Sequence, residues 1–179
     1  MIVTHEMAFA QSICNRVFYM DNAGIYEDGS PEQIFDHPIH DRTRQFVRRL
    51  KVLELEIKSR DYDFRGVVGQ IDQYCRKNHV DSKLTYRIQL CFEEVVQEIL
   101  LKNIEDPLIN AVVEYSEAEE KVTMIMRFNG PELDEFSINS ELSFAMLKRI
   151  VRKFNYDRID SEDYSNRFVF EIDNKSVSR

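Results

Sequence analysis

The sequence predicts an α/β protein in two parts. A two-layer α/β sandwich, with helices on one sheet, is expected over residues 59–179, and a smaller strand–helix–hairpin–helix segment over residues 1–58. The main reason is the order of patterns in the longer part, where helical and alternating apolar spacings follow as helix, helix, strand, strand, helix, strand, strand. Composition agrees: 43% hydrophobic and 31% charged residues suffice for a packed core, and glycine (5) and proline (4) are too scarce for a loop-rich all-β fold.

The shorter part is predicted element by element. The apolar run IVT at residues 2–4 indicates a short buried strand, and HEMAFAQSICNRV has the spacing of a helix. VFYMDNAGIYEDG, residues 17–29, is typical of a hairpin because turn-forming residues separate two apolar runs. Ser30 before Pro31 predicts a helix start with Ser30 as the N-cap. A further helix is expected from about Asp41 through RTRQFVRRL and on through KVLELEIKS.

The longer part is predicted to begin after a change in composition near residues 57–63. FRGVVGQIDQYCRKN has a helical pattern, and Asp81 or Ser82 caps a longer helix through LTYRIQLCFEEVVQEILLKN. NAVVEYSE and KVTMIMRF alternate as strands around the charged turn AEEK, as do NYDRIDS and NRFVFEID around a polar turn. Between these two pairs, LSFAMLKRIVRKF indicates an amphipathic helix.

Charge and hydropathy narrow the class of function. A net charge of −8 and a pI of about 5.1 disfavour nucleic acid and anionic membranes as partners. The apolar runs are shorter than the ~20 residues of a membrane span, so no membrane insertion is expected. Met1 precedes a strand-like run rather than a signal peptide. Three cysteines without CxxC spacing are expected to be reduced, buried thiols of a cytoplasmic protein, namely Cys14, Cys75 and Cys91.

Residues 1–50 contain a long ordered string: a strand ending in THEM, then RVFYMDNAGIYEDGSPEQIF, then HPIHDRTRQF. This string resembles the C-terminal end of an ATP-binding-cassette (ABC) ATPase, of the subfamily that energises polar amino-acid importers. Asn22-Ala23-Gly24 departs from the family pattern by re-spacing the hairpin turn. The resemblance implies an ATP-binding subunit that contacts the membrane subunits of a transporter, peripheral to the inner face of the membrane.

The resemblance gives His5 the role of the switch histidine, whose ring contacts the γ-phosphate and the attacking water. A neutral imidazole can donate a hydrogen bond to a phosphate oxygen and orient a water molecule, and it can do so at a pH near its own pKa. The alternative is a polar residue at a strand end. The sequence has no GxxxxGK[ST] phosphate-binding loop, no LSGGQ-like signature and no apolar strand ending in Asp-Glu before His5. We therefore expect Met1 to be a truncated or internal start, and the chain alone to be inactive as an ATPase.

The stretch DHPIHD places two histidines and two acids within six residues, which suggests a metal site. Pro38 prevents a helix there, so His37 and His40 cannot act as a helical pair of ligands. The ABC subfamily also carries a histidine at the position of His40, within a surface turn. We therefore expect a surface turn and no metal.

Three strings in the longer part, CFEEVVQEIL, FNGPELDEFS and ELSFAMLKRIVRKFNYDR, occur in the order found in the histidine-kinase-type ATPase fold. They resemble the branch of anti-sigma regulatory factors, which are serine kinases. In active members the first string carries a glutamate that activates the attacking group and, four residues on, an asparagine that binds Mg²⁺. Glu94 and Glu98 stand at these positions, on one helix face. A second carboxylate can bind Mg²⁺ but repels ATP phosphates; the alternative is a solvated acidic face that includes Glu93.

In the second string, active members carry an aspartate that binds the adenine amino group. Phe128 stands there, and a phenyl ring cannot accept that hydrogen bond, which costs about 1–3 kcal/mol. The third string, at residues 140–147, lacks the glycines through which backbone amides approach phosphates, and Glu141 adds negative charge. The residues that remain of a degenerate nucleotide site are Glu94, Glu98, Asn129, Gly130 and Asp134.

These three losses predict a second domain that has lost nucleotide binding and needs no cofactor. Two basic helix stripes mark either a partner surface or solvated faces, at Arg42, Arg44, Arg48, Arg49 and Lys51 and at Lys148, Arg149, Arg152 and Lys153. A partial first domain exposes apolar surface, so a homodimer through residues 1–58 is expected.

The sequence leaves three functions open. The first is the C-terminal part of an amino-acid importer ATPase with a regulatory, protein-binding domain. The alternative is an active ATP-binding serine kinase of the anti-sigma type, in which Glu94 and Glu98 hold Mg-ATP. The third is a structural remnant that only dimerises the transporter.

Overall fold

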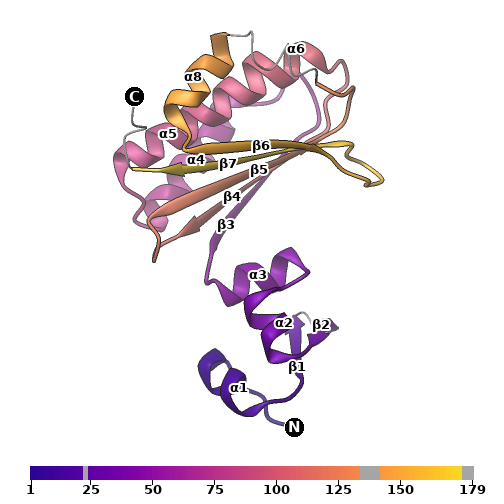
Figure 1. Ribbon diagram of the computed structural model, residues 1–179. Coiled ribbons are helices and arrows are strands. Elements are labelled where there is room, and N and C mark those ends of the chain that lie inside the picture. Colours follow the sequence, from indigo (N-terminus) through magenta and orange to yellow (C-terminus); the bar gives the residue numbers. More distant parts are fainter. Residues whose placement is uncertain (22–23, 134–141, 175–179) are drawn as a thin grey trace. The chain divides into compact units, whose positions relative to one another are not determined.

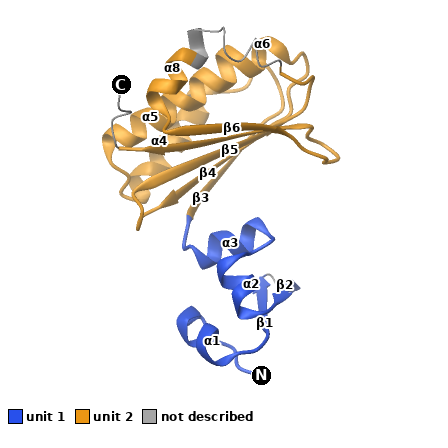
Figure 2. Ribbon diagram, viewed as in Figure 1, with its two compact units in different colours: residues 1–50 blue, residues 51–179 orange. Residues whose placement is uncertain are grey.

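The computed structural model describes residues 1–21, 24–133 and 142–174, and it divides the chain into two compact units, Met1–Leu50 and Lys51–Arg179 (Figure 2). The first unit contains a two-stranded sheet and the second a five-stranded sheet. Within the described ranges, no helix combines the length and the apolar character needed to cross a membrane.

The described part of the first unit consists of short helices around one hairpin. Its elements are α1 Met7–Ile13, β1 Val17–Asp21, β2 Gly24–Gly29, α2 Pro31–Asp36 and α3 Asp41–Val47. The two strands pair antiparallel, so the predicted hairpin is confirmed. The predicted cap of α2 is confirmed as well, because the Ser30 hydroxyl accepts a hydrogen bond from the Gln33 amide at 3.2 Å and Pro31 is the first helical residue.

The first unit buries few apolar side chains. Ile34 is the one buried hydrophobic residue among those described in this unit, and α1 buries no side chain. A two-stranded hairpin with so small a core is marginally stable by itself. The large hydrophobic side chains that stay exposed are Met1, Ile2, Val3, Phe9, Ile13, Phe18, Met20, Ile25, Tyr26, Ile39 and Phe46.

The strand predicted at residues 2–4 does not form. These residues are exposed, and no described strand pairs with them. A strand needs a neighbouring strand to satisfy its backbone amides and carbonyls, and the apolar run alone does not supply one.

The helix expected from about Asp41 through residue 59 was predicted too long. It ends at Val47, and Arg49 follows in the left-handed conformation with φ of 52°. KVLELEI then forms the strand β3, Lys51–Ile57, because its aliphatic residues alternate with polar ones and pair with the next strand of the sheet. The boundary between the compact units therefore falls after Leu50 and not after residue 58.

The second unit is an antiparallel sheet with helices over one face (Figure 1). The strand order is β3–β4–β5–β7–β6, so β3 and β6 are the edge strands. The bounds of the remaining strands are β4 Ile109–Ser116, β5 Lys121–Phe128, β6 Lys153–Arg158 and β7 Asn166–Asp173. Their register sets polar side chains in one row across four strands, namely Asn110, Arg127, Arg167 and Asp157.

The helical layer begins with two helices that are capped by aspartates. Asp63 accepts a hydrogen bond from the Gly66 amide at 2.9 Å, and Asp81 from the Lys83 amide at 2.9 Å, which confirms Asp81 as the cap. The elements of this layer are α4 Phe64–Lys77, α5 Ser82–Glu93, the π-helix η1 Glu94–Leu100, α6 Leu101–Asn103 and α8 Leu142–Ile150. The core lies between this layer and the sheet, and its largest fully buried side chains include Phe92, Phe128, Phe168 and Phe170.

The predicted order of helices and strands is found in the second unit, with β3 added in front. One helix was predicted too long: LSFAMLKRIVRKF remains helical only to Ile150, and β6 begins at Lys153. The alternation of KFNYDR decides this end, because Phe154 and Tyr156 pack against the core from a strand.

Candidate functional site

Glu94 and Glu98 lie on η1, which continues α5 with wider, π-helical turns. π-Helical turns are rare in proteins, and those that occur are often found at functional sites. Both glutamates are partly exposed, and the neighbouring Glu93 is exposed. The opposite side of η1 faces the core through Val95, Val96, Ile99 and Leu100, which are at most 2% exposed. The predicted acidic face therefore exists.

Glu98 is engaged by a lysine on the same helical segment. Its Oε2 atom accepts a hydrogen bond from Lys102 Nζ at 2.6 Å. The two side chains are 45% and 59% exposed, so solvent screens the pair, and exposed pairs of this kind contribute about 0.2–1 kcal/mol. The lysine thus already offsets the charge of this carboxylate. In the described ranges, no three His, Cys, Asp or Glu side chains converge as a metal site.

Asn129 follows β5, and its side-chain oxygen, side-chain nitrogen and backbone amide all bind the loop before β4. Its Oδ1 accepts from the Leu108 amide at 2.8 Å, and its Nδ2 donates to the Asp106 carbonyl at 2.9 Å. Its backbone amide donates to the Leu108 carbonyl at 3.1 Å. The side chain therefore holds the turn after β5 to the loop before β4.

Gly130 is required by the backbone at this turn. Its φ of 103° is one that side-chain-bearing residues rarely adopt. A Cβ atom there would also lie 3.1 Å from Cγ1 of Ile104, the residue that ends α6. The turn after β5 thus packs against the end of the same helical segment that carries Glu94 and Glu98.

A buried polar network of β6 and β7 side chains holds the Gly130 turn in place. Asn166, with 0% exposure, donates from Nδ2 to the Gly130 carbonyl at 3.2 Å and accepts the Tyr156 hydroxyl at 2.6 Å. The Leu133 amide in turn donates to the Tyr156 hydroxyl at 3.0 Å. The sequence did not predict the roles of Asn166 and Tyr156; the one signal was an asparagine at the start of an otherwise largely apolar strand.

Phe128 belongs to the core. Its ring is 0% exposed and lies 5.3 Å from the ring centroid of Phe168, with 29° between the planes. The position that the resemblance assigns to adenine recognition is therefore filled by a stacked aromatic pair. A carboxylate at this place would be buried among apolar side chains.

Two parts of the predicted nucleotide site cannot be compared with these contacts. Asp134 lies outside the described residues, as do residues 140 and 141 at the start of the third string. Of the residues that are described, Asn129 and Gly130 lie at the end of the helical segment that bears Glu94 and Glu98, through the contact of Gly130 with Ile104. His5 belongs to the other compact unit.

His5 lies at a bend immediately before α1 and is exposed. The Thr4 hydroxyl accepts a hydrogen bond from the Glu6 amide at 3.0 Å, which shapes this bend. The imidazole is thus presented to solvent from a short turn rather than from the end of a strand.

The HPIH segment is a turn between α2 and α3, and it is held by a buried carboxylate. Glu27 of β2, 5% exposed, accepts hydrogen bonds from the amides of Ile39 at 2.8 Å and His40 at 3.1 Å. Burial acts to raise the pKa of Glu27, but these amides and the neighbouring Thr43 hydroxyl outweigh it, so the pKa lies below its ordinary value. His37 and His40 are exposed on this turn, as predicted for a surface turn.

No protein-family model matches the chain. A part of it is similar to ATP-binding proteins of amino-acid importers. It is 47% identical over 49 residues to the probable amino-acid import ATP-binding protein YxeO of Bacillus subtilis (strain 168), covering 27% of this chain and 20% of that protein. It is 51% identical over 49 residues to the L-cystine import ATP-binding protein TcyN of the same organism, covering 27% and 19%.

The glutamate/aspartate import ATP-binding protein GltL of Escherichia coli (strain K12) gives a similar match, 44% identical over 50 residues, with 28% of this chain and 21% of that protein covered. The chain thus spans about a fifth of the length of these curated relatives. The matched stretch is about as long as the first compact unit. Roughly a quarter of this chain is therefore homologous to ATP-binding proteins of amino-acid ABC importers.

Proposed function

We propose that this chain is the C-terminal part of an ATP-binding protein of a polar amino-acid importer, and that its second unit is a regulatory domain that binds protein rather than ATP. The relatives support the first half. The core position of Phe128 carries the second half, because it leaves no carboxylate for adenine at the expected place. The proposal puts the chain in the cytoplasm, peripheral to the inner face of the membrane.

The exposed apolar side chains of the first unit support the importer half of the proposal. Among its described residues one hydrophobic side chain is buried and many are exposed, as expected of a piece that packs onto a larger domain. In such a domain the exposed imidazole of His5 would act on the γ-phosphate and the attacking water. The rest of that domain would contact the membrane subunits, and burial of the apolar side chains also favours a homodimer.

In this proposal the second unit has a histidine-kinase-type ATPase fold whose polar groups serve the fold itself, and its order of helices and strands supports this assignment. Asn129 spends its side chain on the loop before β4, and Glu98 binds Lys102. A histidine-kinase-type ATPase fold that has lost its ligands would retain a packed sheet and a surface for protein contacts.

A chimera tests the importer half of the proposal. Residues 1–50 of this chain would replace the matched C-terminal stretch of the L-cystine import ATP-binding protein TcyN, and ATP hydrolysis would be measured. We expect the chimera to hydrolyse ATP and the same chimera with His5→Ala to fall to background. His37→Ala is the matched control, since that histidine is also exposed. Equal rates for all three chimeras would refute the role of His5.

The second candidate is the ATP-binding serine kinase. The observation in its favour is Glu94, which lies on the solvent side of a π-helical turn, as an activating glutamate would. This candidate requires Mg-ATP binding by the purified chain, whereas the regulatory reading requires none.

A further inference from the structure

The strand β6 forms one edge of the five-stranded sheet, and among the described residues it pairs with β7 alone. The Ile159 amide donates to the Ser165 carbonyl, in the register that β6 and β7 share. Hydrogen-bonding groups alternate in direction along an antiparallel strand, so the amides of Phe154 and Tyr156 point away from β7. β6 therefore presents a row of donors and acceptors that a further strand can use.

The two ends of β6 carry opposite charge. Four exposed cations surround its start, namely Lys148, Arg149, Arg152 and Lys153. Three exposed carboxylates follow its end in the turn to β7, namely Asp160, Glu162 and Asp163. When two such strands run antiparallel, the basic end of each lies beside the acidic end of the other, so the attraction occurs twice.

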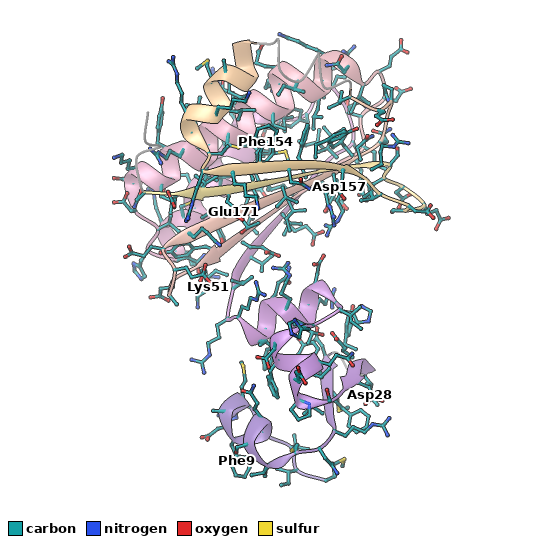
Figure 3. All side chains as sticks on the ribbon, viewed as in Figure 1. Phe9, Asp28, Lys51, Phe154, Asp157 and Glu171 are labelled. Carbon is teal, nitrogen blue, oxygen red and sulfur yellow. The ribbon has the colours of Figure 1, made fainter. Side chains whose placement is uncertain are left out.

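We infer that β6 pairs antiparallel with β6 of a second copy of this chain, joining the two sheets across a two-fold axis. Directly opposed residues in such a pair share a face of the sheet. A pairing centred on Asn155 sets Lys153 opposite the partner's Asp157, and Phe154 opposite the partner's Tyr156. Phe154 and Asp157 are labelled on this strand in Figure 3. An ion pair and an aromatic pair thus form twice, one on each face.

The same register opposes like charges, Arg152 and the partner's Arg158, and this pair also occurs twice. Each guanidinium already has an acceptor within its own copy: Arg152 binds Asp173 at 3.4 Å and Arg158 binds Asn166 at 3.2 Å. Arg167 binds both oxygens of Asp157, at 3.2 and 2.7 Å, and each carboxylate oxygen has a lone pair left for a second cation. Because Asp173 offsets the charge of Arg152, the repulsion within each of these arginine pairs is weakened.

The other edge of the sheet does not have this self-complementarity. β3 carries Glu54 and Glu56 on its exposed side. In a self-pairing centred on Glu54, the middle residue of β3, the carboxylate faces its own copy, and like charges directly opposed destabilise strand pairing. The two edge strands thus supply a matched comparison within one chain.

An interface made by pairing one six-residue strand with its copy buries little surface, so the dimer is expected to be reversible. The inference depends neither on the importer assignment nor on nucleotide binding. Sedimentation velocity on the full chain tests it. We expect a monomer–dimer equilibrium in the micromolar range that Lys153→Glu weakens at least tenfold. Lys51→Glu, at the first residue of the other edge strand, should leave it unchanged. A monomer at all concentrations, or equal effects of both variants, overturns the inference.

Cross-linking locates the axis. Asn155 would face its own copy in a non-hydrogen-bonded pair, where Cα atoms lie about 4.5 Å apart, within reach of a disulfide. We expect Asn155→Cys to form a covalent dimer under mild oxidation, in a background with Cys14→Ser. Lys153→Cys, whose counterpart lies several residues along the strand, should not. Failure of Asn155→Cys to cross-link, or equal cross-linking of both variants, overturns the pairing and moves any dimer to another surface.

Discussion

The Tyr156 hydroxyl donates a 2.6 Å hydrogen bond to Oδ1 of Asn166, whose side chain has no exposed surface. Through this bond the strands β6 and β7 hold the turn at Gly130, whose carbonyl accepts from Asn166. This turn stands where the resemblance to histidine-kinase-type ATPases places adenine recognition. A turn bound so fully to its own sheet has few groups left for a ligand.

Removal of the Tyr156 hydroxyl should destabilise the second unit. Tyr156→Phe removes the shorter of the two hydrogen bonds to Asn166 Oδ1, which keeps only Arg158 as a donor, and it takes away the acceptor of the Leu133 amide. Loss of such buried hydrogen bonds costs about 1–3 kcal/mol. The free energy of unfolding in urea measures this loss. Tyr86→Phe is the control, because that side chain is 63% exposed and should change stability little. Equal losses in the two variants would mean that the network carries no stability.

The Phe128 ring is expected to contribute more than any polar contact around it. Phe128→Ala removes a fully buried ring that stacks on Phe168, and such substitutions cost about 3–5 kcal/mol. Met146→Ala, at a side chain of α8 that is 37% exposed, serves as the comparison in the same unfolding experiment. A loss below that of Met146→Ala would place Phe128 outside the core, and its site would again be open to a ligand.

The first unit should loosen in acid through Glu27. Its pKa is lowered in the folded state, so the stabilisation is present above the ordinary pKa of 4.5 and is lost as the pH falls through the lower, folded value. Hydrogen-exchange protection of the Ile39 and His40 amides should fall over that range. Glu27→Gln should lower the protection already at neutral pH, whereas Glu32→Gln, on an exposed side chain, should not. Protection that stays constant in acid would contradict this role.

The end of α3 offers a stabilising substitution. Arg49 has φ of 52°, a conformation that costs a residue with a side chain about 1 kcal/mol relative to glycine. Arg49→Gly should therefore raise the melting temperature of the first unit. Arg48→Gly is the control, since Arg48 has φ of −84° and glycine there only adds freedom to the unfolded chain. Destabilisation by both variants would show that the Arg49 side chain matters more than its backbone.

The elements that the sequence predicted well are those with local signals. Ser30 and Asp81 begin helices through their own hydrogen bonds to the next turn, so neighbouring residues suffice to identify them. β3 and the start of β6 were assigned to helices because each follows a helix directly. KVLELEI fits both periods over seven residues, and its pairing with β4, far along the chain, decides between them.

Some features of the candidate site were likewise predictable from neighbouring residues, and others depend on contacts between distant segments. The acidic side of η1 follows from the spacing of Glu94 and Glu98 on one helix, which the sequence contains. The joint role of Tyr156, Asn166 and Gly130 depends on three segments meeting in space, and single-sequence patterns do not carry that information. The π-helical form of η1 had no sequence signal either, since its buried positions also fit an α-helix.

The central claim, that the second unit binds no nucleotide, is tested most directly by calorimetric titration of the full chain with Mg-ATP and with ADP. We predict no binding heat and no thermal shift at millimolar nucleotide, for the wild type and for Glu94→Ala alike. Micromolar binding that disappears in Glu94→Ala would contradict the claim and identify the chain as an ATP-binding kinase.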